Sequence, residues 1–292
     1  MSFLSSLAFV MRHPLNRAAS AAALLRVLRW QIGSRLLAGP IALPFVDDTY
    51  LFAARGMTGA TGNWYCGLHE ADDMAFVLHM LRPGDLFLDV GANIGSYTVL
   101  AAGGAGAKVI SVEPIPATFE KLQVNVVLNK LSERIELHCA GLSDTRRTLR
   151  FSSEQDTMNH VLVHGEQVPA IEVPVLELDD LLAGRVPQII KIDVEGHEKA
   201  VLSGAARTLS NPGLTAVIME VNGSGVRYGI ADDELLAVMR DHGFEPMHYD
   251  GILRQVSDWR ATGGNAIFVR HRSAIAARVA DAPKHRLVNG VI

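Results

Sequence analysis

Residues 85–113 begin with Asp85-Leu-Phe-Leu-Asp89-Val-Gly91-Ala-Asn93-Ile-Gly95-Ser-Tyr97, and this stretch decides the fold. Leu86 to Val90 is a short apolar run, which predicts a buried parallel strand. A glycine-rich turn follows, and the pattern from Tyr97 to Ala102 is helical. A strand, a tight turn and a helix in this order place backbone N–H groups at the carboxyl edge of a sheet, where open α/β sheets bind ligands.

The second strand of this unit ends in an acidic residue. Lys108 to Val112 predicts a strand, and Glu113 follows it at 24 residues from Asp89 (113 − 89). A carboxylate at the end of the second strand is placed to accept hydrogen bonds from both hydroxyls of a ribose. The stretch therefore predicts a nucleoside ligand.

The glycine spacing indicates which nucleoside is bound. A dinucleotide site requires G-x-G-x-x-G, but here Gly91 and Gly95 are separated by three residues and Asn93 replaces the second glycine. Asp89 at the turn repels phosphate and favours a cation such as an amino group or a sulfonium. The spacing argues against a nicotinamide dinucleotide. It resembles motif I of class I methyltransferases that use S-adenosylmethionine (SAM).

The composition is that of a globular protein. Of the 292 residues, 49% are hydrophobic and 20% are charged, which is enough apolar sequence for a large core. No apolar run reaches the roughly 18–20 residues that span a bilayer. Met1 to Met11 lacks the basic start and the cleavage site of a secretory signal. Two cysteines, Cys66 and Cys139, form neither a disulfide framework nor a metal site, so we expect a cytoplasmic protein.

Charge is distributed unevenly along the chain. Up to Val46 there are five arginines and no acid, while the remainder has 22 basic and 31 acidic residues, a balance of −9. The predicted helix over residues 15–38 carries an apolar face, although Arg35 intrudes on it. The residues of that face are Leu24, Leu25, Leu28, Ile32 and Leu36. Two interpretations stay open: peripheral contact with a membrane or an acidic partner, and packing on the core or on a second subunit of a homo-oligomer.

The chain divides into three parts. Residues 1–82 form an N-terminal extension with the basic helix, a short hairpin over 41–46 and 49–53, a glycine-rich loop over 55–70 and a helix over 70–81. Residues 83–272 alternate strands and helices, which predicts a parallel α/β sheet with helices on both faces. Short strands over 149–152, 161–163 and 171–173 form an insertion at the ligand-binding edge. Residues 273–292 are predicted to be a surface tail.

The fourth strand has an unusual composition. It runs Ile189-Ile-Lys191-Ile-Asp193 and continues as Val-Glu195-Gly-His197-Glu198. A central strand is normally apolar, yet Lys191 and Asp193 point to the same face. A buried lysine needs a partner, and we expect Glu220 on the neighbouring strand, residues 216–222, to supply it. Charged groups at the carboxyl edge of a sheet indicate a functional site.

This run resembles the signature of FkbM-type methyltransferases. The resemblance rests on Lys191-Ile-Asp-Val-Glu-Gly-His-Glu198 with Val201-Leu-Ser-Gly-Ala205, and on the motif over 89–97 with Glu113-Pro114, Asn125 and Asn129. It implies a Rossmann-like class I fold with a mostly parallel seven-stranded sheet and SAM as the cofactor. It also implies methyl transfer to a hydroxyl oxygen of a sugar, glycolipid or secondary metabolite.

The expected site residues fall into groups by role. A hydroxyl needs a general base, for which His197 is the first candidate and Glu195 the second, with Asp193 near the methyl group. We expect the cofactor to be bound by Asp89, Gly91, Asn93, Gly95, Ser96, Glu113, Pro114, Ser143 and Asp144. We expect Asn159, Lys191, Glu220 and Asn222 to face the substrate. Alternatively, Asp193, Glu220 and Asn222 hold a divalent metal through oxygen ligands.

Other functions are weighed from the same residues. The Asn/Asp-Pro-Pro-aromatic run typical of amino methylation of DNA bases is not found at Asp193-Val-Glu195, and neither cysteine follows a proline there as cytosine C5 methylation requires. A nucleic-acid partner also needs a basic groove, whereas residues 47–292 are acidic overall. Two alternatives remain: methylation of a nitrogen on a small molecule or peptide, and a methyltransferase fold that only binds partners.

Overall fold

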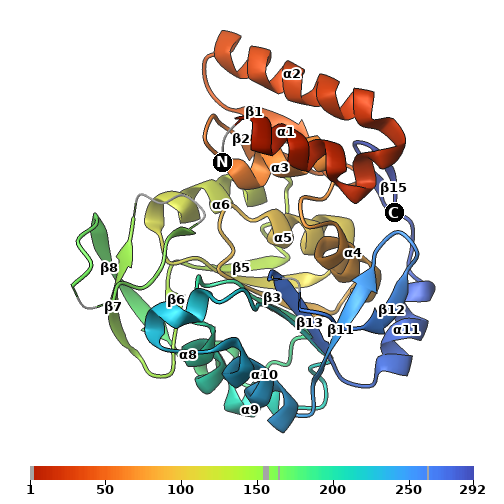
Figure 1. The fold of residues 1–292 in the computed structure, drawn as a ribbon. Helices are drawn as coiled ribbons and strands as arrows, with labels where there is room; N and C mark the ends of the chain where they lie inside the picture. The colour runs from red at the N-terminus through yellow and green to blue at the C-terminus, as the bar shows by residue number, and fades with distance from the viewer. Residues whose placement is uncertain (1–2, 154–157, 164, 262) are drawn as a thin grey trace.

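The computed structural model describes residues 3–153, 158–163, 165–261 and 263–292, and an eight-stranded sheet lies at its centre (Figure 1). The strand order is β12-β11-β13-β10-β9-β3-β4-β5. In chain order the strands are β3 (Leu86–Val90), β4 (Lys108–Val112), β5 (Ile135–His138), β9 (Ile189–Ile192), β10 (Ala216–Glu220), β11 (Glu245–Asp250), β12 (Gln255–Asp258) and β13 (Asn265–Val269).

The strand directions confirm the expected Rossmann-like α/β fold with a mostly parallel sheet. Neighbours from β5 through β4, β3 and β9 to β10 pair in parallel, while β13 is antiparallel to both β10 and β11. The expected seven strands were one too few. β12 pairs antiparallel with β11 and adds an edge strand, Gln-Val-Ser-Asp, whose polar sequence gave no strand signal.

Helices cover both faces of the sheet because its strand residues alternate between two cores. Phe87 and Val109 belong to one core, and their neighbours Leu88 and Ile110 belong to the other. The first core is covered by α4 (Ala71–Met80), η2 (Leu100–Gly104) and α6 (Pro116–Leu128). The second is covered by α7 (Leu178–Leu182), α8 (Glu198–Ser203), α9 (Ala206–Leu209) and α10 (Asp232–Asp241). Two short elements, α5 (Ser96–Val99) and η4 (Ser224–Tyr228), follow the ends of β3 and β10.

The N-terminal extension forms a layer at one end of the molecule (Figure 1). It consists of α1 (Phe3–Arg12), η1 (Pro14–Ala19), α2 (Ser20–Leu36), the hairpin β1 (Ile41–Pro44) and β2 (Tyr50–Ala53), and α3 (Thr58–Cys66). The hairpin is confirmed. The single helix over 15–38 was wrong, because Ala19 leaves the helical conformation (φ −146°, ψ 49°) between η1 and α2. The glycine-rich loop was also wrong, since α3 occupies much of it. Among the described residues, no helix is long and apolar enough to cross a membrane.

The C-terminal segment is not the surface tail that we expected. It contains α11 (Arg272–Ala280), β14 (Arg286–Leu287) and β15 (Gly290–Val291). Ile275 and Val279 are buried in the core beside α4. Asn289 donates hydrogen bonds to the carbonyls of Leu15 (3.0 Å) and Cys66 (2.8 Å). The end of the chain therefore ties the N-terminal extension to the main body.

The predicted insertion is a three-stranded sheet of its own. β6 (Gly141–Leu142), β8 (Ala170–Leu176) and β7 (Arg147–Ser152) lie in the order β6-β8-β7. The strand expected over 161–163 was wrong, because Val161 forms a single bridge with Phe151 and the ladder does not continue through the described residues. Phe151 and Val161 pack against Ile115, so this small sheet borders the carboxyl edge of β4.

Candidate active site

A cavity of about 610 Å³ lies at the carboxyl ends of β3, β4, β9 and β10. The main sheet contributes one wall, with Asp89, Glu113 and Glu220. The N-terminal extension contributes a second wall from α1 and α3, and the inserted sheet contributes Phe151. Small-molecule sites have volumes of roughly 300–1,000 Å³, so the cavity has the size of such a site.

The turn after β3 brings its residues close to β9. Gly91 has φ +78°, and a Cβ built on it would lie 1.8 Å from the backbone oxygen of Asp193. Asn93 is also left-handed (φ +50°), and its N–H donates to Glu113 at 2.9 Å. Gly95 (φ +89°) lies behind the turn, where a Cβ would meet Leu122 at 2.4 Å. The backbone contact therefore excludes a side chain at Gly91, and the left-handed conformation disfavours one at both glycines.

Asp89 and Glu113 are buried carboxyl groups at the ends of β3 and β4. Asp89 accepts a hydrogen bond from the Thr98 hydroxyl at 2.6 Å, and burial raises the pKa of Asp89 to about 6. Glu113 accepts one backbone N–H on each oxygen, from Asn93 and from Ile115 (3.0 Å). Burial raises the pKa of Glu113 to about 7. Each of its oxygens keeps a second lone pair, so Glu113 is oriented yet able to accept further hydrogen bonds.

Lys191 is buried at the wall of the cavity, as expected, but its partner is Asp193. The Lys191 ammonium donates to the Asp193 carboxylate at 2.7 Å and lies 4.7 Å from the centre of the Tyr97 ring. The expected ion pair with Glu220 was wrong. The register explains this, because Ile218 pairs with Lys191 and Glu220 stands two residues further along. Burial by itself lowers the pKa of Lys191, but the neighbouring carboxylates, Asp193 foremost, outweigh it and hold that pKa above its ordinary value.

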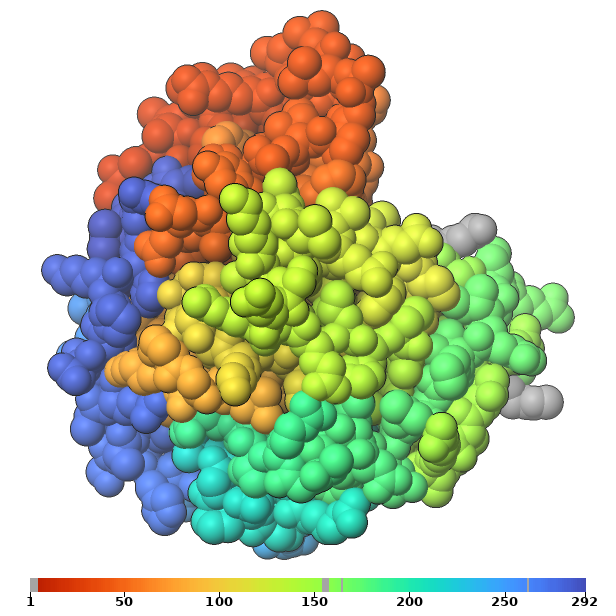
Figure 2. All heavy atoms as spheres, turned by 180° about the vertical axis from the view of Figure 1, so that it is seen from behind, coloured from red at the N-terminus to blue at the C-terminus, as the bar shows by residue number. Residues whose placement is uncertain are grey.

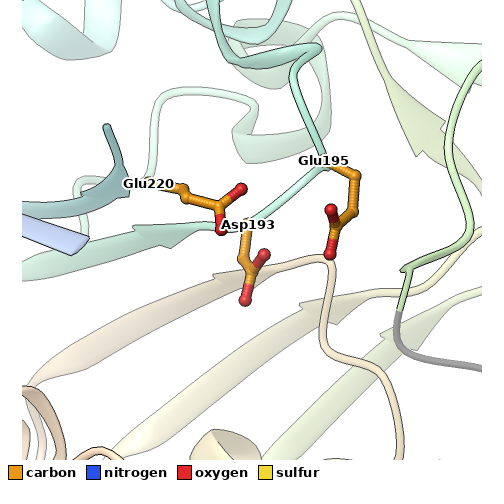
Figure 3. A group of neighbouring side chains, drawn as sticks. All are labelled: Asp193, Glu195 and Glu220. Carbon is orange, nitrogen blue, oxygen red and sulfur yellow. The ribbon is translucent and has the colours of Figure 1, made fainter. Parts of the chain in front are cut away.

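Three carboxyl groups converge at the ends of β9 and β10 (Figure 3). Asp193, Glu195 and Glu220 each contribute an oxygen, and these oxygens lie within 4.8 Å of one another. Glu195 has a left-handed backbone (φ +54°). Burial, together with the charge of Asp193, raises the pKa of Glu195 to about 7 and that of Glu220 to about 8. Like charges this close favour sharing of a proton near neutral pH.

The cluster of Asp193, Glu195 and Glu220 differs from the predicted set of metal ligands, which contained Asn222 in place of Glu195. Asn222 donates its amide N–H to Glu220 at 2.6 Å, and its amide oxygen accepts the N–H of Ser224 at 2.9 Å. The Asn222 amide oxygen therefore already accepts a hydrogen bond. Glu195 has a carboxylate oxygen close to those of Asp193 and Glu220. The oxygen set that the structure brings together is therefore Asp193, Glu195 and Glu220. Metal binding there stays a prediction.

His197 lines the cavity, and its ring has defined partners. Nε2 lies 3.1 Å from the hydroxyl oxygen of Ser143, and the ring packs edge-on against Tyr228. The residue is the N-cap of α8, but its side chain makes no capping hydrogen bond. Burial lowers the pKa of His197, with Arg147 adding to the effect, so the imidazole is neutral near pH 7. A neutral imidazole has one nitrogen that accepts a proton.

Some of the remaining predicted site residues line the cavity and others do not. Ser96, Pro114 and Asn159 line it, as do Gly91 and Asn93. Four others are not among the described residues that line it: Gly95, Ser143, Asp144 and Asn222. Ser143 is fully buried behind His197, and Asp144 forms an ion pair with Arg147 at 2.9 Å. A direct contact of Ser143 and Asp144 with the cofactor stays a prediction.

The N-terminal extension contributes residues to the cavity that were not predicted from the sequence. Asn63 from α3 lines the cavity and donates to the Ser96 hydroxyl at 3.2 Å. Glu70 also lines it and accepts from the Tyr97 hydroxyl at 2.7 Å. Asn265 donates to Asp73 at 2.9 Å behind them. The glycines over 55–70 were a usable signal, because close packing against a ligand-binding edge is one reason for a glycine-rich stretch.

Comparisons with known proteins agree with this geometry. The family model described as Methyltransferase FkbM domain matches residues 89–246, which is more than half of the chain. The 31-O-demethyl-FK506 methyltransferase FkbM of Streptomyces tacrolimicus is 29% identical over 224 residues, covering 63% of this chain and 84% of that protein. The hexuronic acid methyltransferase AglP of Haloferax volcanii is 28% identical over 159 residues, covering 52% of this chain and 62% of that protein. The match thus spans less than two thirds of AglP.

Proposed function

The chain belongs to the FkbM methyltransferase family, and we propose that it methylates a hydroxyl oxygen of a sugar, glycolipid or secondary metabolite. The class I methyltransferase fold implies SAM as the cofactor. The observation that carries the proposal is that His197 and three carboxyl groups line the same cavity as Asp89 and Glu113. The names of the two relatives support it, since one refers to a 31-O-demethyl compound and the other to a hexuronic acid.

The residues at the β3 and β4 ends fit SAM. Glu113 has an oriented carboxylate with free lone pairs, as a ribose diol requires, and Asn93 and Pro114 border the same edge. Asp89 and Glu113 are buried carboxyl groups whose pKa values are raised, and a nearby cation favours their charged forms. When bound, SAM supplies an electrophilic methyl group on a cationic sulfur.

The acceptor hydroxyl must lose its proton as the oxygen–methyl bond forms and the sulfur–methyl bond breaks. We assign the proton acceptor to His197. The Ser143 hydroxyl donates to Asp144 at 2.9 Å, so in this pattern His197 Nε2 donates to Ser143 and the basic lone pair belongs to Nδ1. Asp144 and Ser143 thus orient the ring, and general-base catalysis contributes roughly 10²–10⁴-fold to the rate. Glu195 is the second candidate, since its raised pKa makes it a stronger base than an ordinary carboxylate.

Binding of S-adenosylhomocysteine tests the cofactor assignment. Calorimetry should show micromolar binding to the wild-type protein and at least tenfold weaker binding to Glu113→Ala, because hydrogen bonds to a charged group contribute about 1.5–3 kcal/mol each. Glu133→Ala, at an exposed glutamate, is the control and should bind like the wild type. Failure of the wild-type protein to bind, or equal affinity of Glu113→Ala, contradicts the assignment.

A screen of hydroxylated glycans and metabolites then tests the reaction, with His197→Asn and Glu195→Gln as variants. If His197 is the base, His197→Asn loses about 10²–10⁴-fold in kcat, and the wild-type rate keeps its full value down to a pH below the ordinary histidine pKa, because burial lowers the pKa of His197. An acidic limb near pH 7 that Glu195→Gln removes would transfer the role to Glu195. Methyl transfer to amines in place of hydroxyls would overturn the O-methylation proposal.

A further inference from the structure

Helix α2 is apolar on two opposite faces. At about 100° per residue, Ala23, Val27 and Trp30 lie on its inner face. They are 0%, 4% and 7% exposed, and α2 packs against α1 and α3. This inner face accounts for the attachment of α2 to the rest of the extension.

The outer face carries a second apolar stripe that is exposed to solvent. Leu25, Leu28, Ile32 and Leu36 follow the spacing i, i+3, i+7 and i+11, which places them on one side of the helix. Their exposed fractions are 46%, 53%, 58% and 78%, and Leu37 just after the helix is 59% exposed. Figure 1 shows α2 as the outermost helix at its end of the molecule. A contiguous apolar stripe on a surface helix indicates a binding face.

Arginines frame this stripe. On the helical wheel Arg29 and Arg35 lie roughly 60° to either side of its centre, and both are exposed. Arg12 and Arg17 nearby in the extension are exposed as well. The first 46 residues contain no acid, whereas the rest of the chain has a balance of −9. The first 46 residues, which carry the stripe, are therefore net positive while the rest of the chain is net negative, and their layer rises at one end of the molecule in Figure 2.

We propose that α2 docks the protein on the surface of a membrane that contains anionic lipids. The helix lies in the interfacial plane, with the stripe among the acyl chains and Arg29 and Arg35 at the level of the phosphates. A second copy of the chain fits this face less well. A two-fold contact through the stripe would bring the arginines of both copies together, and neither α1 nor α2 contains an acid to offset them.

Vesicle flotation tests the proposal with the full chain. The protein should float with vesicles of phosphatidylcholine and phosphatidylglycerol in equal parts, and not with phosphatidylcholine alone. Leu28→Glu with Ile32→Glu should weaken binding at least tenfold, because it places charge in the stripe. Arg29→Gln with Arg35→Gln should weaken it about tenfold and reduce its dependence on salt. The matched control is Ile252→Glu with Leu253→Glu, in the β11–β12 turn, where the exposed fractions are 55% and 61%.

Four outcomes overturn the proposal. They are no flotation with the mixed vesicles, equal flotation with both kinds of vesicle, equal loss of binding in the stripe and control variants, and a wild-type dimer in sedimentation velocity that the stripe variant abolishes. The last outcome would assign the face to a second copy. Far-UV circular dichroism melts of each variant separate lost binding from lost folding. None of these readouts requires methyl transfer, so failure here leaves the proposed function standing.

Discussion

Gly91 is the residue on which the geometry of the site most directly depends. Its left-handed backbone disfavours a side chain, and a Cβ would lie 1.8 Å from the Asp193 carbonyl oxygen. That oxygen belongs to the backbone, so it cannot give way as a flexible side chain would. The close approach lets the ends of β3 and β9 meet, and it brings Asp89 and Asp193 into one cavity.

Backbone strain alone costs about 1–3 kcal/mol. Gly91→Ala should destabilise the protein by more than this, because the clash is added to the strain, and it should weaken S-adenosylhomocysteine binding at least tenfold. Urea unfolding and calorimetry measure the two effects. Gly84→Ala is the matched control, because Gly84 has φ +93° and no atom within 4 Å of the built Cβ. That variant carries the strain without the clash. Equal costs in the two variants would show that the contact with Asp193 is unimportant.

Among single residues, the sequence predicts the positions that strand geometry determines. Alternation along β9 places Lys191 and Asp193 on one face, and the structure pairs them. Alternation does not predict the position of Glu195, because a left-handed turn (φ +54°) brings it to the Asp193 group. Strand register likewise decides that Glu220 lies level with Asp193 and not with Lys191. The apolar periodicity of one strand predicts neither the turn that positions Glu195 nor the register between β9 and β10.

Helix α3 shows why one element was not predictable from local propensity. Glycines disfavour helices, so residues 55–70 were predicted to form a loop. A Cβ on Gly62 would lie 2.7 Å from the His69 ring, so this glycine permits close packing of the helix against the segment after it. Tertiary packing outweighs propensity here. The hairpin and α4 were predictable because the spacing of their apolar residues is typical of a strand pair and of a helix.

The C-terminal segment acts as a clamp on the N-terminal extension through Asn289. Its amide N–H group donates to the Leu15 and Cys66 carbonyls and to the Asn16 side chain (3.0 Å). Asn289→Ala should therefore cost about 1–3 kcal/mol, because buried acceptors lose their donor. We also expect faster amide hydrogen exchange over residues 3–66, with the main sheet unchanged.

A control variant and a binding measurement complete the test of Asn289→Ala. Asn211→Ala is the control, since that side chain caps a local turn at Gly213. Because the N-terminal extension lines the cavity, a loosened extension should also weaken S-adenosylhomocysteine binding in Asn289→Ala. Unchanged exchange over residues 3–66 would contradict a clamping role.

At the scale of the whole molecule, buried and half-buried carboxyl groups collect around one cavity. Burial raises the pKa of Glu113 and of Glu195 to about 7, and that of Glu220 to about 8. The native protein therefore keeps protons that the unfolded chain has already released. Where the native state binds more protons, the free energy of unfolding falls as pH rises, here up to the raised pKa values.

Buried and half-buried histidines act in the opposite direction, but at lower pH. Burial lowers the pKa of His79 to about 3 from its ordinary 6.5, and it also lowers the pKa values of His13, His69 and His197. The unfolded chain binds these protons below pH 6.5, which destabilises the native state there. At pH 6.5 these histidines are still about half protonated in the unfolded chain, so they offset part of the loss between pH 6.5 and about 7.5. Above that range the carboxyl groups determine the slope, and they include Asp73, whose pKa burial raises to about 7.

The ligand-free protein should therefore lose stability as the pH rises from 6.5 to 8. Urea unfolding at the two pH values measures this loss. Glu220→Gln removes the group with the highest of these three raised pKa values, so its loss of stability over the same interval should be smaller. Glu133→Gln, at an exposed glutamate, should retain the wild-type loss. Stability that stays constant or increases between the two pH values would mean that the carboxyl groups of the cavity are ionised in the native protein, and proton sharing among Asp193, Glu195 and Glu220 would then be wrong.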